Sequence, residues 1–92
     1  ERDETRTIAD KRFSVFPNPT GADLFVQAKL STNEQVRLKL IDSAGRLLLP
    51  VRRSGHLVNE QLDLQHTPAG HYYLLVSDAR GKLLHSVKIL KQ

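Results

Sequence analysis

Histidine is the side chain that titrates near neutral pH, so the four histidines of this chain are its first candidates for acid–base or metal chemistry. They are His56, His66, His71 and His85. No two stand in an H-x-H, H-x-x-H or H-E-x-x-H motif, so none are preset as ligands on one element. The chain has no cysteine, which excludes a thiolate-bound metal and a disulfide. We interpret the histidines as surface or strand-edge residues and expect no metal site and no cofactor.

Two acidic loops share a pattern that suits either calcium or a turn. Asp42-Ser43-Ala44-Gly45-Arg46 is echoed by Asp78-Ala79-Arg80-Gly81-Lys82. Each loop offers one carboxylate, whereas calcium takes about six to eight oxygen ligands. An aspartate that accepts backbone N–H bonds, with a glycine three residues later, is typical of a hairpin turn. The pattern therefore predicts two hairpins.

Other catalytic and binding motifs are missing. The sequence has no G-x-S-x-G, no glycine-rich phosphate loop and no cysteine nucleophile. A pair of carboxylates could come only from distant loops, and a domain this small rarely encloses a cleft of roughly a few hundred Å³. We therefore do not expect an enzyme.

The net charge of +4 raises the question of nucleic acid. After Asp78 the charged residues are all basic: Arg80, Lys82, Lys88 and Lys91. Sheets that bind nucleic acid interleave such residues with exposed aromatics, and this last segment has none. We interpret it as a solvated strand face and expect no nucleic-acid partner.

Composition divides the chain into a tether and one domain. Residues 1–12 contain four acidic and four basic residues and a single large apolar residue, Ile8. From Phe13 onward apolar residues recur, and the first run stops at Pro17-Asn18-Pro19, where two residues lack an N–H donor. We predict a charged flexible linker over 1–12 and a domain over 13–92.

Apolar residues in 13–92 alternate with polar ones, in runs separated by turn residues, and no helical period persists. The pattern predicts seven strands near 13–16, 23–30, 35–42, 46–52, 60–64, 71–78 and 82–90. Seven short strands favour an all-β, antiparallel, two-sheet sandwich of immunoglobulin type, essentially without helix. No apolar run approaches the ~20 residues of a membrane span, so we expect no membrane insertion.

The last hairpin has a register that the turn suggests. If Asp78 pairs with Lys82, Leu75 faces His85, Tyr73 faces Val87 and Tyr72 faces Lys88. Both faces of the strand 71–78 then carry apolar residues. Such a strand either has a covered outer face or presents a surface to a partner.

A set of landmarks in fixed order carries a family resemblance. They are Phe13-Ser14-Val15-Phe16-Pro17-Asn18-Pro19-Thr20-Gly21, Asp23-Leu24, the Asp42–Arg46 turn, Leu62-Asp63-Leu64, Pro68-Ala69-Gly70-His71-Tyr72-Tyr73 and Lys88-Ile89-Leu90-Lys91-Gln92. From Phe13 to Gln92 the chain resembles the C-terminal sorting domain of type IX secretion cargo in Bacteroidetes. His71 stands where the family usually has an aliphatic residue, and Pro50 suggests an edge strand or bulge.

The resemblance implies a non-catalytic secretion signal. Such a domain directs a Sec-exported cargo from the periplasm through the outer-membrane type IX translocon to the cell surface or the medium. A surface sortase commonly removes it, here at or before the linker 1–12. The implied partners are translocon and sortase components and cargo domains N-terminal to it in the same chain.

The resemblance also implies roles for single residues. Lys88, Ile89, Leu90 and Lys91 match the closing motif and are candidates for recognition by the translocon, or are structural. The other motif residues are expected to be mainly structural: Pro17, Asn18, Pro19, Asp42, Gly45, Arg46, Gly70, Tyr72 and Gly81.

An alternative class is a passive immunoglobulin-like spacer or a carbohydrate-binding module of an exported enzyme. The latter needs an exposed aromatic platform, for which Phe25 and Tyr73 are the candidates. Strand edges at Phe13–Phe16 and Lys82–Leu90 also leave room for a strand-swapped homodimer.

Overall fold

The computed structural model describes residues 10–92, in which seven strands form two antiparallel sheets without a helix. The strands are β1 (Ser14–Phe16), β2 (Asp23–Lys29), β3 (Val36–Asp42), β4 (Arg52–Ser54), β5 (Leu57–Asp63), β6 (Gly70–Asp78) and β7 (Leu83–Lys91). Most of the predicted linker, residues 1–9, lies outside the described residues. The boundary between residues 12 and 13 therefore remains a prediction.

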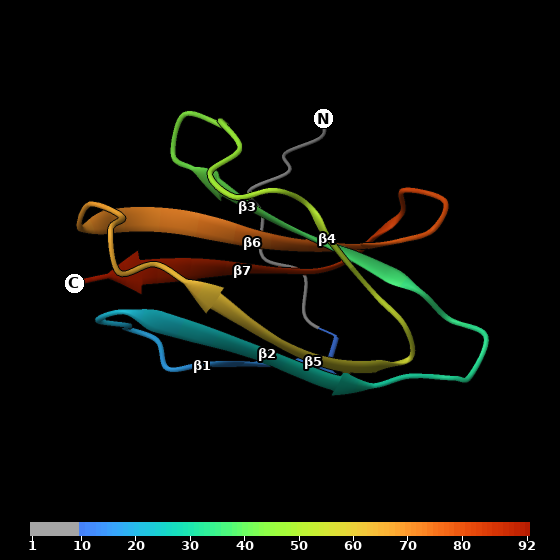
Figure 1. The fold of residues 1–92 in the computed structure, drawn as a ribbon. Coiled ribbons are helices and arrows are strands. Elements are labelled where there is room, and N and C mark those ends of the chain that lie inside the picture. Colours follow the sequence, from blue (N-terminus) through green and yellow to red (C-terminus); the bar gives the residue numbers. More distant parts are fainter. Residues whose placement is uncertain (1–9) are drawn as a thin grey trace.

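The two sheets lie face to face as layers (Figure 1). One has the strand order β1-β2-β5 and the other β4-β3-β6-β7. Three pairs of consecutive strands, β1 with β2, β3 with β4 and β6 with β7, each pair within one sheet, and the chain crosses between the layers at the β2–β3, β4–β5 and β5–β6 connections. The predicted seven-stranded sandwich is thus confirmed. In the described part of the chain, no helix is long and apolar enough to cross a membrane.

The core forms where the apolar half of each alternating strand faces the other sheet. The side chains that are buried almost completely include Leu24 and Val26 of β2, Leu38 and Leu40 of β3, Leu74 and Val76 of β6, and Ile89 of β7. Burying a side chain of this size contributes about 1.5–3 kcal/mol. Period-two alternation therefore specifies both the strands and the face that each one buries.

Tyr72 makes a contact that is typical of this fold class. It is buried near the start of β6, and its hydroxyl donates to the carbonyl oxygen of Pro68 at 2.6 Å. This bond ties the β5–β6 connection to the strand that follows, as in the tyrosine corner of immunoglobulin-like domains. The expectation that Tyr72 is mainly structural stays a prediction, with which this contact agrees.

The prediction of a strand over 46–52 was wrong in its position. An isolated bridge pairs Ile41 with Leu47, and β4 itself covers only Arg52–Ser54. Pro50 lacks an N–H donor, which explains why the ladder is interrupted before β4. The strand predicted over 60–64 likewise begins earlier, at Leu57.

The predicted register of the last hairpin was wrong by one residue. Asp78 N–H does donate to Lys82 O at 2.8 Å, as expected. A β-bulge then follows, because Ser77 faces Leu83 while Val76 faces His85. The extra residue, Leu84, shifts every later pair, and Tyr72 faces Ile89 instead of Lys88.

The outer face of β6 is covered at its centre. Leu75 is 4% exposed, and Ile41 on the neighbouring strand is 5% exposed. Tyr73 faces Ile41 and Lys88 and remains partly accessible. The outer face of β6 is therefore covered at Leu75 and partly accessible at Tyr73, and a partner at this face stays a prediction.

Candidate functional site

The closing motif Lys88–Lys91 lies at the end of β7, and the pleat of the strand divides its four side chains. Lys88 is exposed and Leu90 is half-buried, both on the outer face of the sheet. Ile89 is fully buried in the core. Lys91 is also buried, and its Nζ donates to Gln92 O at 3.1 Å. Of these four side chains, only those of Lys88 and Leu90 are accessible on the outer face of the sheet.

The segment around Asn18 covers the free edge of this motif. Asn18 Nδ2 donates to Lys88 O at 2.9 Å, and Leu90 N–H donates to Asn18 Oδ1 at 3.1 Å. The flanking Pro17 and Pro19 have no N–H to offer, so the Asn18 amide supplies both a donor and an acceptor. One side chain therefore replaces a short stretch of partner strand.

Thr20 continues the contact with its backbone. Thr20 N–H donates to Leu90 O at 2.9 Å, and Gln92 N–H donates to Thr20 O at 2.9 Å. Thr20 itself is fully buried and forms a parallel bridge with Lys91. We call the contact of Asn18 and Thr20 with Lys88–Gln92 the C-terminal clasp. It joins two landmarks that are about 70 residues apart in sequence.

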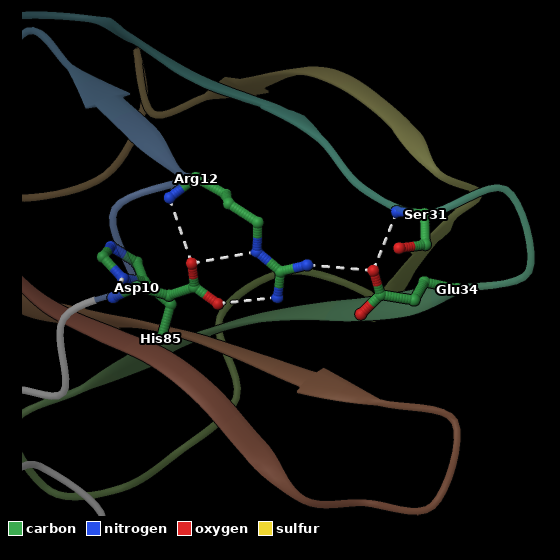
Figure 2. A network of polar contacts seen from close by, with 5 residues as sticks. All are labelled: Asp10, Arg12, Ser31, Glu34 and His85. Carbon is green, nitrogen blue, oxygen red and sulfur yellow. Dashed lines mark hydrogen bonds and ion pairs between the residues drawn. The ribbon is translucent and has the colours of Figure 1, made fainter.

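A second contact fixes residues 10–13 against the other end of β7 (Figure 2). Asp10 N–H donates to His85 Nδ1 at 3.0 Å, and Phe13 stacks on the His85 ring with centroids 5.4 Å apart. Arg12 bridges Asp10 at 2.8 Å and Glu34 at 2.9 Å. We call this group the N-terminal anchor.

The anchor orders several charges. The hydrogen bond from the Arg12 side chain is the main cause that lowers the pKa of Asp10, and the same contact raises that of Arg12. Glu34 accepts the N–H of Ser31 at 2.8 Å, which is the main cause that lowers its pKa. Exposed ion pairs of this kind contribute little to stability on their own, so the anchor depends on their combination with Phe13.

His85 differs from the other groups because burial lowers its pKa. The nearby Asp10 carboxylate opposes this shift to a smaller extent. Since Nδ1 accepts the Asp10 N–H, the neutral ring carries its proton on Nε2. A second proton on Nδ1 would replace this acceptor with a donor and break the bond.

The clasp and the anchor place the entering chain alongside β7. The anchor holds residues 10–13 at His85, and the clasp holds Asn18 and Thr20 at Lys88–Gln92. Between them, β1 pairs with β2 of the other sheet. Residues 10–20 thus close one open side of the sandwich.

The two acidic loops are hairpin turns, as predicted. The Asp42 carboxylate accepts the N–H groups of Ala44 and Arg46 at 2.9 Å, and the latter is the main cause that lowers its pKa. Asp78 does the same for Arg80 and Lys82. Gly45 and Gly81 have φ values of 86° and 87°, which favour glycine.

Within residues 10–92, no three His, Asp or Glu side chains gather as metal ligands do. The aromatic pair named for a sugar platform is also not formed: Phe25 and Tyr73 lie on strands of different sheets. Phe25 stacks instead on Phe16 of β1, with ring centroids 5.6 Å apart.

Sequence reasoning missed the clasp and the anchor. The signal for the clasp was an asparagine between two prolines, where a side chain must make the polar contacts that the backbone cannot. The sequence contains no comparable signal for the pairing of Asp10 with His85.

Comparison with known proteins bears on the whole described fold. A family model described as a secretion system C-terminal sorting domain matches residues 14–92, which include all seven strands. No curated protein matches the chain. The chain therefore belongs to the family of type IX secretion C-terminal sorting domains.

Proposed function

We propose that this domain is recognised in its folded state by the outer-membrane type IX translocon, after Sec export of its cargo to the periplasm. As a member of its family, it carries a type IX secretion signal for export toward the cell surface or the extracellular space. The observation that carries the proposal is the clasp, which holds the closing motif in one defined conformation.

Within the closing motif, we propose different roles for the accessible and the buried side chains. Lys88 and Leu90 are accessible on the outer face and are the residues that we propose the translocon contacts. Ile89 and Lys91 are buried, so their role is to hold the strand in place. A basic and an apolar side chain side by side fit a partner with an apolar surface and an acidic rim.

The anchor bears on removal of the domain by a sortase. A protease needs an extended, accessible chain. Residues 10–13 are held by His85, Glu34 and their own ion pairs, so we place the cut before Asp10.

A secretion assay tests the proposal. Residues 1–92 are fused behind a Sec signal and a folded reporter in a Bacteroidetes host, with and without a working translocon. We expect export that depends on the translocon and is lost in Lys88→Ala/Leu90→Ala. The matched control is Lys29→Ala/Leu57→Ala, an exposed pair on the other sheet. Equal export by both variants, with both shown to be folded, would contradict the assignment.

A carbohydrate-binding module is a second candidate, favoured by the stacked pair of Phe16, which is exposed, and Phe25, which is half-buried. Gln61 lies opposite Phe25 on the same outer face, so an aromatic surface has a polar neighbour, as sugar ligands require. Retention on insoluble glycans that is lost in Phe16→Ala, together with reporter held in the periplasm of both strains, would favour this function.

A further inference from the structure

Arg37 of β3 and Arg53 of β4 lie directly opposite each other in the ladder. Both are exposed on the outer face of the four-stranded sheet. Like charges in this position repel and destabilise a sheet. The fold nevertheless places these two arginines as cross-strand partners on one face of the sheet.

Three of the other four arginines within residues 10–92 are placed next to carboxylates, and Arg80 is the exception. These pairs are Arg12 with Asp10 and Glu34, Arg46 with Asp42, and Arg52 with Glu60. Within residues 10–92, neither Arg37 nor Arg53 forms an ion pair. Their positive charge is therefore not neutralised by this part of the domain.

The two arginines line a surface hollow of about 320 Å³. Its other polar lining comes from Gln35 and Ser54, and Gly55 leaves one wall open. Guanidinium groups present several N–H donors in a planar fork, which matches the oxygens of an oxyanion. Gln35 also lines the hollow, whereas Ser54 faces the core residue Val36 in the ladder, so its side chain points away from the two arginines.

We infer that this hollow, between Arg37 and Arg53, is a binding site for a phosphate group. A phosphate monoester carries about −1.5 to −2 charges and three strong acceptor oxygens, which suits two cations with neighbouring polar groups. A single carboxylate would neutralise only one of them. Lys39 follows Arg37 on the same face of β3, so cationic surface continues beyond the hollow. This site is separate from the closing motif and does not rest on the proposed secretion role.

Titration of the chain with inorganic phosphate tests the inference. Amide and arginine side-chain NMR signals are followed at constant ionic strength, with sodium chloride as the reference salt. We expect phosphate to shift the signals of Arg37, Arg53 and Ser54, and Arg53→Gln or Arg37→Gln to weaken binding at least about tenfold. The matched control, Lys29→Gln, removes the same charge from the other sheet and should leave binding unchanged.

Thermal unfolding gives an independent readout. Without phosphate and at low salt, Arg53→Gln should raise Tm because the repulsion is relieved. Phosphate should raise the Tm of the original chain and not that of the variant. Shifts no larger than those with chloride, or equal weakening by Arg53→Gln and Lys29→Gln, would overturn the inference.

Vesicles distinguish the source of the phosphate. Binding to vesicles that contain phosphatidic acid, whose headgroup is a phosphate monoester, would identify a lipid headgroup if inorganic phosphate displaces the protein. Phosphate binding without vesicle binding would identify a soluble or glycan-borne phosphate. Binding of an acidic peptide at Arg37 and Arg53, in the absence of any effect of phosphate, would assign the hollow to a protein partner and refute the proposal.

Discussion

Asn18 has a structural effect that its exposed position would not suggest. Its amide is hydrogen-bonded to the backbone of Lys88 and of Leu90. These bonds join residues that are 70 and 72 positions apart in the sequence. Because proline has no backbone N–H, neither Pro17 nor Pro19 can donate to Lys88 O in place of the Asn18 amide.

We expect Asn18→Ala to reduce the free energy of unfolding by about 1–3 kcal/mol, since it removes two hydrogen bonds. Urea denaturation measures this change. Asn33→Ala, in an exposed turn, is the matched control and should be nearly neutral. Equal stability of the two variants would mean that the Asn18 amide contributes nothing to the clasp.

His85 makes the anchor sensitive to pH. Burial lowers its pKa from the ordinary 6.5, so the unfolded chain takes up this proton first as the pH falls. The stabilising contribution of neutral His85 is therefore complete above pH 6.5 and is lost as the pH falls through the lowered folded value. Glu34 and Asp10 stay ionised between pH 5 and pH 7.5, because their pKa values are lowered from the ordinary 4.5 and 3.8.

The measurement is urea denaturation at pH 7.5 and at pH 5. The original chain should lose more stability on acidification than His85→Phe, which keeps a ring against Phe13 and does not titrate. A variant with the same pH dependence as the original chain would refute this role of His85.

At the scale of the elements, the side chains of β7 alternate between a core-facing set and an outward-facing set. Ile89 faces Tyr72 within the core, whereas Lys88 faces Tyr73 on the outer face. The bulge at Leu84 determines which residues belong to which set. A deletion of the closing residues would therefore mix two effects, loss of a recognition surface and loss of core packing.

Point substitutions separate these effects. Ile89→Ala should cost about 2–5 kcal/mol of unfolding free energy because it leaves a cavity in the core. Lys88→Ala should change stability by less than about 0.5 kcal/mol and reduce export. Urea denaturation and the secretion assay measure the two quantities. A loss of export by Lys88→Ala in proportion to a loss of stability would argue against a contact with the translocon.

At the scale of the whole molecule, each outer face carries a pair of like charges. The pair on the three-stranded sheet is acidic, and the pair on the four-stranded sheet is basic. Asp23 faces Asp63 on the three-stranded sheet, and Arg37 faces Arg53 on the four-stranded sheet. Each pair lies opposite in its own ladder, so each weakens the layer that holds it.

We expect Asp23→Asn to raise the free energy of unfolding by about 0.2–1 kcal/mol at low salt, because it relieves one repulsion. Asp23→Glu keeps the charge and is the control. The gain should shrink in high salt, where screening already weakens the repulsion. Calorimetry at two salt concentrations checks this, and a gain that is independent of salt would contradict an electrostatic cause.

The edges of the sandwich bear on assembly. The predicted strand-swapped homodimer remains a prediction. The clasp covers the edge of β7 at Leu90 with Asn18 and Thr20, so exchange of β7 would have to break these four hydrogen bonds first.

The sequence by itself determined the features that depend on neighbouring residues. Alternation specified the number of strands and their buried faces, and the Asp42 and Asp78 loops specified two hairpin turns. The order of the landmarks indicated the family that the comparison then showed. These properties are local, because side-chain periodicity and turn chemistry act over a few residues.

Tertiary structure alone decided the contacts between distant segments. A single bulged residue, Leu84, moved His85 opposite Val76, and it reversed which side chains of the closing motif face the core. The clasp, the anchor and the Arg37–Arg53 pair each depend on such placements. A one-residue shift turns every side chain of a strand to the other face, so these sites follow from the folded register and not from the pattern of any one strand.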